Sequence, residues 1–311
     1  MRDLSDIGFY TLSSHRAKHS DASSPLWRCE MLLTKRCNFK CPYCRGINGD
    51  DITHKNALST LSLWADNQLK NVRFSGGEPT LHNGLIDFVA YCKSKGVERI
   101  AISTNGSAGT ELYMKLFGAG VNDFSISLDG CCANTHDTMS GTRGMFDTVV
   151  DNIRELSKRT YVTVGMVYNE MNKDSITDSI AFVHSLGVSD IRIIPSAQYG
   201  KEMNLQLPEW SRQFPILTYR TSGSRLVRGL SSTDCPKCKL VLDDMAVWGG
   251  YHYPCIIYLR ENGKPIGKVS SDMRQERLNW YNAHNSFNDA ICRTNCLDVC
   301  VEHNNCANIY P

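Results

Sequence analysis

The chain has 311 residues, of which 41% are hydrophobic and 21% charged, and its formal net charge is +2. This length allows one large domain with a smaller one, and the composition is that of a folded protein rather than a disordered one. The nearly balanced charge gives no overall attraction to nucleic acid or to an anionic membrane, so we expect neither partner. There is no apolar run of about 18 residues and no apolar secretion signal at the start, so we expect a cytoplasmic protein.

The chain contains fourteen cysteines, which is unusual for such a protein. Because the cytoplasm keeps thiols reduced, we do not expect them to form a disulfide framework. Many of them are clustered, first between residues 37 and 44 and again between 235 and 306. This clustering favours metal or iron–sulfur ligation.

Strand and helix patterns alternate along the first two thirds of the chain. Residues 1–30 carry no motif, and we expect this N-terminal segment to lie on the barrel that follows. Apolar runs predict strands at 29–34, 72–75, 99–103, 123–127, 162–167 and 190–194. Helical periodicity predicts helices near 58–68, 81–95, 112–117, 146–158 and 175–185. Such repeats specify a parallel α/β sheet, and we predict a partial (β/α)6 TIM-like barrel over residues 31–195.

Polar or glycine-rich residues follow each of the first four predicted strands. A cysteine loop follows the first strand, and Ser75-Gly-Gly-Glu-Pro79 follows the second. Ser103-Thr-Asn-Gly106 and Ser127-Leu-Asp-Gly130 follow the next two. In α/β barrels functional groups gather at the carboxyl ends of the strands, so we expect the site there.

The alternation stops after residue 195. Pro208, Pro215 and Gly223 mark loops, and we interpret residues 196–230 as a linker or a substrate-facing insertion. Four arginines lie between Glu209 and Asp234 with no acidic residue among them, namely Arg212, Arg220, Arg225 and Arg228. We favour a solvated loop over an anion-binding role for this segment. Residues 231–311 are cysteine-rich and are expected to form a second, smaller domain.

The cysteine loop has the spacing Cys37-x3-Cys41-x2-Cys44. A closed zinc site needs four ligands, and no fourth cysteine or histidine stands next to these three. Iron–sulfur clusters are normally held by cysteine thiolates, so a [4Fe–4S] cluster with one open iron fits the count. A zinc site completed by a remote residue is the alternative.

This loop, with Tyr43 before its last cysteine and Gly-Gly-Glu-Pro at 76–79, resembles the radical S-adenosylmethionine (radical SAM) superfamily. The resemblance covers residues 31 to about 195. It implies that the amino and carboxylate groups of SAM chelate the open iron. It further implies reductive cleavage of SAM to a 5′-deoxyadenosyl radical that abstracts a substrate hydrogen, an activity of the oxidoreductase or maturase type. A reductase such as flavodoxin or ferredoxin is the implied electron donor.

The same resemblance implies which residues contact SAM. Gly76 and Gly77 allow the backbone to approach the methionine moiety, and Glu78 matches the position whose surroundings receive its ammonium group. Tyr43 is expected against the adenine. Contacts at the next strand ends are expected from Ser103, Asn105, Ser127 and Asp129. Arg143 could pair with the cofactor carboxylate or with substrate, although a plain loop arginine is the alternative; we assign no catalytic residue.

The C-terminal cysteines predict a second metal centre. Cys235-x2-Cys238 followed by Gly250-x4-Cys255 suits zinc and an iron–sulfur cluster equally, with Cys255 on a predicted hairpin. Beside a radical SAM barrel, this spacing resembles the opening of the twitch and SPASM extensions, which hold auxiliary [4Fe–4S] clusters. The later cysteines depart from SPASM spacing, so we expect one auxiliary cluster, held by some of Cys235, Cys238 and Cys255 with one or two of Cys292, Cys296 and Cys300. Cys306 is left out of this set.

The sequence leaves the substrate open. Oxidation, cross-linking or maturation of a peptide or protein is the leading hypothesis, and modification of a small molecule or nucleotide is the alternative, supported by the arginine segment. A zinc-binding interaction module is the non-enzyme alternative. Gly-Gly-Glu-Pro argues against that module, because a zinc module has no need of the motif.

Overall fold

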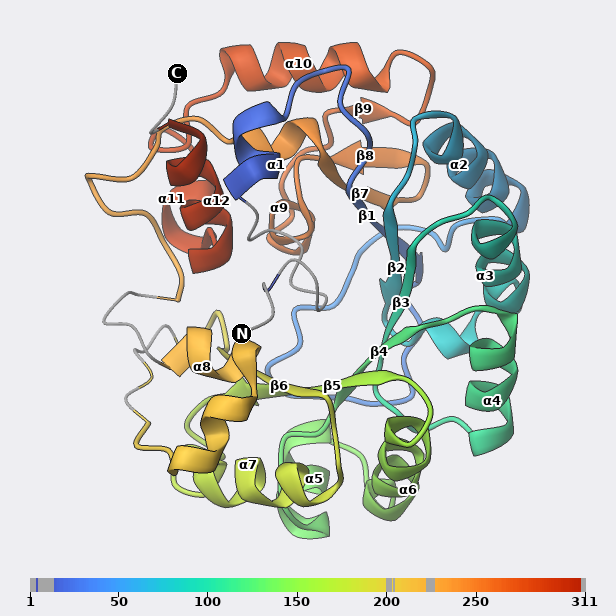
Figure 1. Cartoon of the computed structure of the whole chain (residues 1–311), viewed down its shortest axis with the longest axis vertical. Coiled ribbons are helices and arrows are strands. Elements are labelled where there is room, and N and C mark those ends of the chain that lie inside the picture. The colour runs from blue at the N-terminus through green and yellow to red at the C-terminus, as the bar shows by residue number, and fades with distance from the viewer. Residues whose placement is uncertain (1–3, 5–13, 200–202, 204, 222–226, 309–311) are drawn as a thin grey trace.

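The computed structural model describes residues 4, 14–199, 203, 205–221 and 227–308, so the first part of the expected N-terminal segment lies outside the described residues (Figure 1). The described residues form a sheet in the order β6-β5-β4-β3-β2-β1-β7-β8-β9. Its strands are β1 (Arg28–Thr34), β2 (Asn71–Gly76), β3 (Arg99–Thr104), β4 (Asp123–Ser127), β5 (Tyr161–Tyr168), β6 (Asp190–Pro195), β7 (Asp244–Trp248), β8 (Tyr251–Tyr253) and β9 (Gly267–Lys268). Pairing from β6 through β1 to β7 is parallel, which confirms the predicted open parallel barrel.

Helices cover the outer side of this curved sheet (Figure 1). The covering helices are α2 (His54–Asp66), α3 (Leu85–Ser94), α4 (Thr110–Ala119), α5 (Ala133–Ser140), α6 (Phe146–Ser157) and α7 (Ile176–Ser185). The remaining helices are α1 (Ser14–His19), α8 (Pro215–Thr221), α9 (Ile256–Arg260), α10 (Met273–Ala283), α11 (Ala290–Asn295) and α12 (Asp298–Asn308), with 3-10 turns η2 (Pro79–Leu81), η3 (Glu209–Gln213) and η4 (Lys239–Leu242). No helix of the described chain is long and apolar enough to cross a bilayer.

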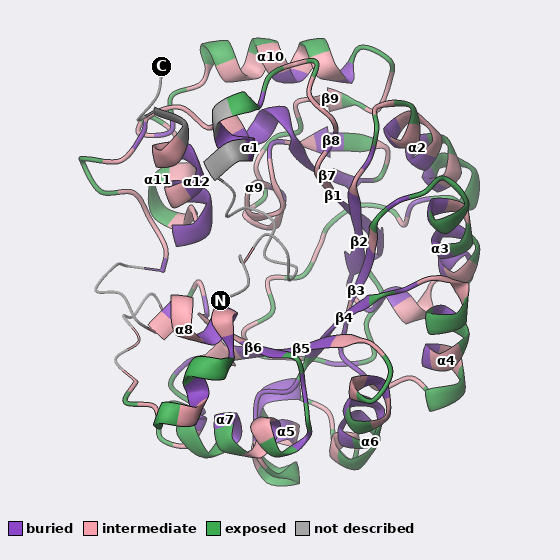
Figure 2. Cartoon of the chain, in the orientation of Figure 1, coloured by how far each residue is buried: buried purple, intermediate pink, exposed green. Residues whose placement is uncertain are grey.

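Side chains alternate between the two faces of the barrel strands. On β2, Phe74 packs against Phe88 of α3, with ring centroids 6.3 Å apart, whereas Arg73 and Ser75 line the interior. The apolar side chains bury the outer face under the helices, and the strands are almost entirely buried (Figure 2). Because the inner positions are polar, the centre of the barrel is a lined cavity rather than a hydrocarbon core.

The C-terminal region continues the barrel sheet. Arg28 of β1 is in register with Asp244 of β7, and their side chains form an ion pair at 2.9 Å. Strands β7 and β8 form the predicted hairpin, whose turn places Gly249 and Gly250 at φ of 57° and 86°, values that favour glycine. The sheet therefore continues without interruption across the domain boundary expected near residue 231.

Three details differ from the sequence predictions. The helix expected from Leu81 begins at Leu85, because Pro79 opens a single 3-10 turn. Helix α5 was not predicted, since its sequence ANTHDTMS lacks apolar periodicity. The solvated-loop interpretation is wrong for Arg220, which is 5% exposed on α8 and forms a buried ion pair with Asp298. Arg225 lies outside the described residues.

Candidate active site

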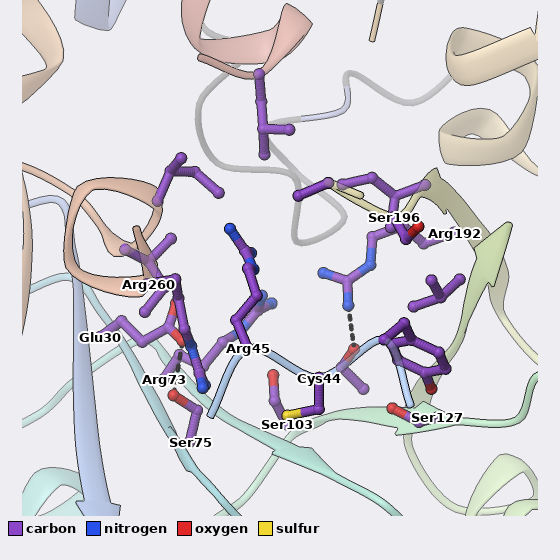
Figure 3. Close-up of a pocket in the computed structure, with 18 of the residues that line it drawn as sticks. Glu30, Cys44, Arg45, Arg73, Ser75, Ser103, Ser127, Arg192, Ser196 and Arg260 are labelled. Carbon is purple, nitrogen blue, oxygen red and sulfur yellow. Dashed lines mark hydrogen bonds between the residues drawn. The ribbon is translucent and has the colours of Figure 1, made fainter. Parts of the chain in front are cut away.

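A cavity of about 430 Å³ opens at the carboxyl ends of the barrel strands (Figure 3). All three loop cysteines line it, namely Cys37, Cys41 and Cys44. The expected SAM-contacting residues that also line it are Tyr43, Gly76, Gly77, Ser103, Asn105, Ser127 and Asp129. Arg143 is exposed and is not among the lining residues, so its expected contact remains a prediction.

The cysteine loop is held against the end of β2 by backbone contacts. Gly77 N–H donates to Thr34 O at 2.7 Å, and Glu78 N–H donates to Arg36 O at 2.8 Å. A Cβ added at Gly76, where φ is 142°, would lie 2.5 Å from Thr34 O. A Cβ at Gly77 would lie 2.7 Å from Lys35 O and closer still to Arg36 O. Both glycines are therefore required by the close approach of this chain's own loop, in addition to any approach of a cofactor.

The three thiols stand in a setting that suits a metal centre. Backbone N–H groups donate to two of them, from Phe39 to Cys37 Sγ and from Gly46 to Cys44 Sγ, each at 3.4 Å. Burial raises the pKa of the Cys41 thiol to about 12. A bound cation would offset this cost of ionisation, so three free thiols with one ligand position left open fit an iron–sulfur cluster.

Glu78 joins the ends of β2 and β3. Its side chain is buried, and its Oε1 accepts hydrogen bonds from Thr80 N at 3.1 Å and from Thr104 Oγ1 at 2.7 Å. Its Oε2 accepts from Asn105 N at 2.7 Å. Burial raises the pKa of this carboxyl, although the hydrogen bonds oppose the rise. Glu78 therefore fixes Asn105, whose amide nitrogen lies 3.9 Å from Cys37 Sγ.

Tyr43 connects the cysteine loop to the end of β4. Its hydroxyl donates a hydrogen bond to Asp129 Oδ2, and Val167 N donates to Asp129 Oδ1 at 2.6 Å. Burial raises the pKa of Asp129 to about 6. Two residues expected at the cofactor thus contact each other, and the pair holds the loop over the cavity.

The sequence analysis did not identify several residues of the cavity. Arg73, Arg192 and Arg260 line it, with Arg73 on β2 and Arg192 on β6. An arginine inside a predicted buried strand was the available signal, because such strands rarely carry a charge without a function. His136 of α5 also lines the cavity, is 2% exposed, and has no hydrogen-bond partner among the described residues on either ring nitrogen.

A second pocket lies in the C-terminal region, and all six expected auxiliary ligands line it, namely Cys235, Cys238, Cys255, Cys292, Cys296 and Cys300. Cys306 is not among them. Burial raises the pKa of Cys238 to about 12, the same condition as at Cys41. His284 is an additional candidate ligand, with its Nε2 3.5 Å from Cys292 Sγ. Cys255 and Cys300 also line the central cavity, so the two sites share a wall.

A buried arginine organises the segments around this second pocket. Arg277 of α10 donates to Val241 O at 2.7 Å, Tyr253 O at 2.9 Å and Pro254 O at 3.1 Å, and also to Asp244 O. These carbonyls belong to the segment that follows Cys238 and to the one that precedes Cys255. One guanidinium thereby sets the spacing between two of the cysteine-bearing segments.

Comparisons with known proteins identify the family of the barrel. The family model described as the Radical SAM superfamily matches residues 31–183. A probable GTP 3′,8-cyclase of Saccharolobus solfataricus is 30% identical over 176 residues, which are 55% of this chain and 57% of that protein. Molybdenum cofactor biosynthesis protein 1 of Drosophila melanogaster is 30% identical over 172 residues, or 52% of this chain and 30% of that protein. The matched region thus spans between about a third and somewhat over half of these relatives.

Solved structures share the fold at low identity. Streptococcus suis SuiB bound to S-adenosylmethionine has a TM-score of 0.61 at 18% identity, covering 84% of this chain and 66% of that one. The enzyme anSMEcpe with bound AdoMet has a TM-score of 0.58 at 14% identity, covering 82% and 81%. The family implies an enzyme that uses a [4Fe–4S] cluster and SAM, and the three free thiols of the cavity suit that cluster. Through residues 31–183, this chain belongs to the radical SAM superfamily.

Proposed function

We propose that Cys37, Cys41 and Cys44 hold the [4Fe–4S] cluster and that the chain reductively cleaves SAM to abstract a hydrogen from a substrate in the same cavity. The observation that carries this proposal is that all three thiols line one cavity together with the glycine motif and the polar ends of β3 and β4. When bound, the cluster supplies the electron that breaks the sulfonium bond of SAM.

The residues of the chain supply position and polarity. Gly76 and Gly77 let the cysteine loop lie directly on β2, which sets the distance between the thiols and the SAM site. Asn105, fixed by Glu78, presents its amide to Cys37. Tyr43 donates to Asp129 and so covers the side of the cavity at β4.

We further propose that the second pocket holds one auxiliary [4Fe–4S] cluster. Six cysteines line that pocket, which is more than the four that one cluster needs, so the ligands are a subset of them. The wall shared through Cys255 and Cys300 would put this cluster beside the substrate. That position suits the removal of an electron from a substrate radical.

For the substrate, we propose a small anionic molecule, because arginines dominate the charged lining of the cavity. Relatives named as probable GTP 3′,8-cyclases agree with a nucleotide or another small anion. The peptide substrate expected from the sequence is the second candidate, since SuiB, which has a similar fold, has been solved bound to its precursor peptide SuiA.

Anaerobic reconstitution tests the proposal. The protein should be brown and contain about eight iron atoms per chain if both clusters form. With a chemical reductant, the wild type should form 5′-deoxyadenosine from SAM, and Cys41→Ala should form none. Cys255→Ala should keep some cleavage but lose product formation, and Cys132→Ala, an exposed thiol outside both pockets, is the matched control. Undiminished cleavage by Cys41→Ala, or a colourless protein with stoichiometric zinc, would overturn the assignment.

A further inference from the structure

The central cavity carries more positive charge than its own residues balance. Seven arginines line it, against three carboxylates. Three of these arginines have carboxylate partners, in the pairs Arg28–Asp244, Arg45–Glu261 and Arg220–Asp298. Among the residues that the structure describes, the other four form no ion pair with a carboxylate, and these are Arg73, Arg192, Arg228 and Arg260. Arg73 is buried and the other three are half-buried. The lining carboxylates, Glu30, Asp123 and Asp129, are fewer than these four arginines, so a bound anion would offset the remaining positive charge.

Arg192 is built into the barrel wall. It is in register with Gly165 on β5, and a Cβ at Gly165 would lie 3.2 Å from Arg192 Nη2. The missing side chain of Gly165 therefore leaves room for the guanidinium, which donates to Ser125 Oγ at 3.4 Å and points into the cavity (Figure 3). Burial and the nearby Arg73 and Arg220 lower the pKa of Arg192 to about 10, although Glu30 and Asp123 oppose this shift.

Arg228 reaches the same cavity from the segment after α8. Its Nε donates to Pro195 O, at the end of β6, at 3.3 Å. Within the described part of the chain, Arg228 Nη1 and Arg73 Nε are buried and have no hydrogen-bond partner. Burial and repulsion by Arg45 and Arg220 lower the pKa of Arg228 to about 10. Donors of this kind, planar and still unused, match the oxygen atoms of phosphate or carboxylate groups.

SAM alone does not account for these arginines. Its single carboxylate can be bound by one bidentate guanidinium. Arg260 is the best placed for that role, because it donates to Gly76 O of the glycine motif at 2.8 Å. In Figure 3, Arg260 and Arg192 lie on opposite sides of the cavity. Arg73, Arg192 and Arg228 therefore remain for a second ligand.

We infer that Arg192 and Arg228, assisted by Arg73, bind an oxyanion group of the substrate that carries at least two negative charges. This inference rests on the proposed function and names the chemical class of its substrate. Phosphate and paired carboxylates share the chemistry that these arginines recognise, and the test separates the two sources.

The test is equilibrium binding to the reconstituted holoenzyme saturated with SAM, with inorganic pyrophosphate and malonate as separate probes. We expect Arg192→Met and Arg228→Met each to weaken binding of the preferred probe by about tenfold or more. Arg192→Lys, which keeps the charge but loses the planar fork, should recover part of the affinity. Arg212→Met is the matched control, because Arg212 is exposed, with 78% of its side chain accessible, and it should bind as the wild type does.

The outcomes distinguish the two kinds of anion, and they separate the anion site from the proposed function. Tighter binding of pyrophosphate supports a phosphate-bearing substrate, and tighter binding of malonate supports a carboxylate-bearing one. Binding of neither probe by the wild type, or equal affinity in wild type, Arg192→Met and Arg228→Met, would overturn the anion site. Because Arg228 lies outside the barrel strands, its variant keeps the test valid if Arg192→Met fails to fold. Formation of 5′-deoxyadenosine, measured in parallel without probe, reports on the proposed function independently.

Discussion

Gly77→Ala tests whether the cysteine loop depends on its close approach to β2. The added Cβ would lie 2.7 Å from Lys35 O, whereas ordinary contact begins at 3.4 Å, and Arg36 O would be closer still. Both neighbours are backbone atoms, so no side-chain rotation can relieve the overlap. The loop would have to move by a distance on the order of 1 Å, a shift that can cost about a hundredfold in rate. Overpacking of this kind also costs about 1–3 kcal/mol of stability.

The assay compares the rate of 5′-deoxyadenosine formation and the free energy of unfolding in urea, with iron content measured on the same samples. Gly118→Ala is the matched control, because Gly118 lies in α4 and a Cβ there would meet nothing within 4 Å. That control should keep full activity and gain about 0.5–1 kcal/mol, since alanine is the better helix former. If Gly77→Ala kept wild-type rate and stability, the approach of the loop to β2 would not be what requires the glycine.

Two further predictions concern the support of the cavity and of the second pocket. Burial raises the pKa of Asp190 to about 6. When folding raises the pKa of a carboxyl group, the folded protein loses stability as the pH rises through that value. The unfolding free energy of the wild type relative to Asp190→Asn should therefore fall by roughly 1 kcal/mol between about pH 5 and about pH 7.5. Asp66→Asn serves as the control, because Asp66 is exposed. An equal pH slope of the unfolding free energy in wild type and Asp190→Asn would contradict the prediction. Arg277→Met should lower the iron content from about eight to about four atoms per chain while SAM cleavage continues. Arg154→Met, at an exposed position of α6, is the control and should keep all of the iron. If Arg277→Met retained about eight iron atoms, Arg277 would not be what spaces the cysteine-bearing segments.

The barrel was predictable from the sequence because its signals are local. Apolar runs separated by periodic helices define a parallel sheet whatever the distant residues are, and the bounds of β4 were predicted to the residue. The cysteine loop and Ser75-Gly-Gly-Glu-Pro79 were identified for the same reason, since each lies within one short segment. Helix α5 shows the limit of this approach, because a polar helix that packs one face near a site has no clear period.

The charged lining was not predictable because it depends on contacts between distant segments. From the sequence, Arg220 is interpreted as a loop arginine, because its partner Asp298 lies 78 residues later in the chain, on α12. Arg228 is interpreted in the same way, and only the structure shows that it donates to Pro195 O at the end of β6. Sequence patterns report the environment of a residue within about one helix or strand, whereas burial of a charge is decided by tertiary neighbours.

The pairing of β7 with β1 explains why the two cysteine groups lie close together. The cysteine loop leaves the carboxyl end of β1, and Cys255 follows the hairpin that begins with β7. Because β1 and β7 are adjacent and parallel, a single row of hydrogen bonds joins the strands from which both groups arise. Strand order therefore accounts for the wall that the central cavity shares with the second pocket. A separate domain tethered by a linker would not fix that distance, whereas a continuous sheet does, and electron exchange between two clusters would require such a fixed distance.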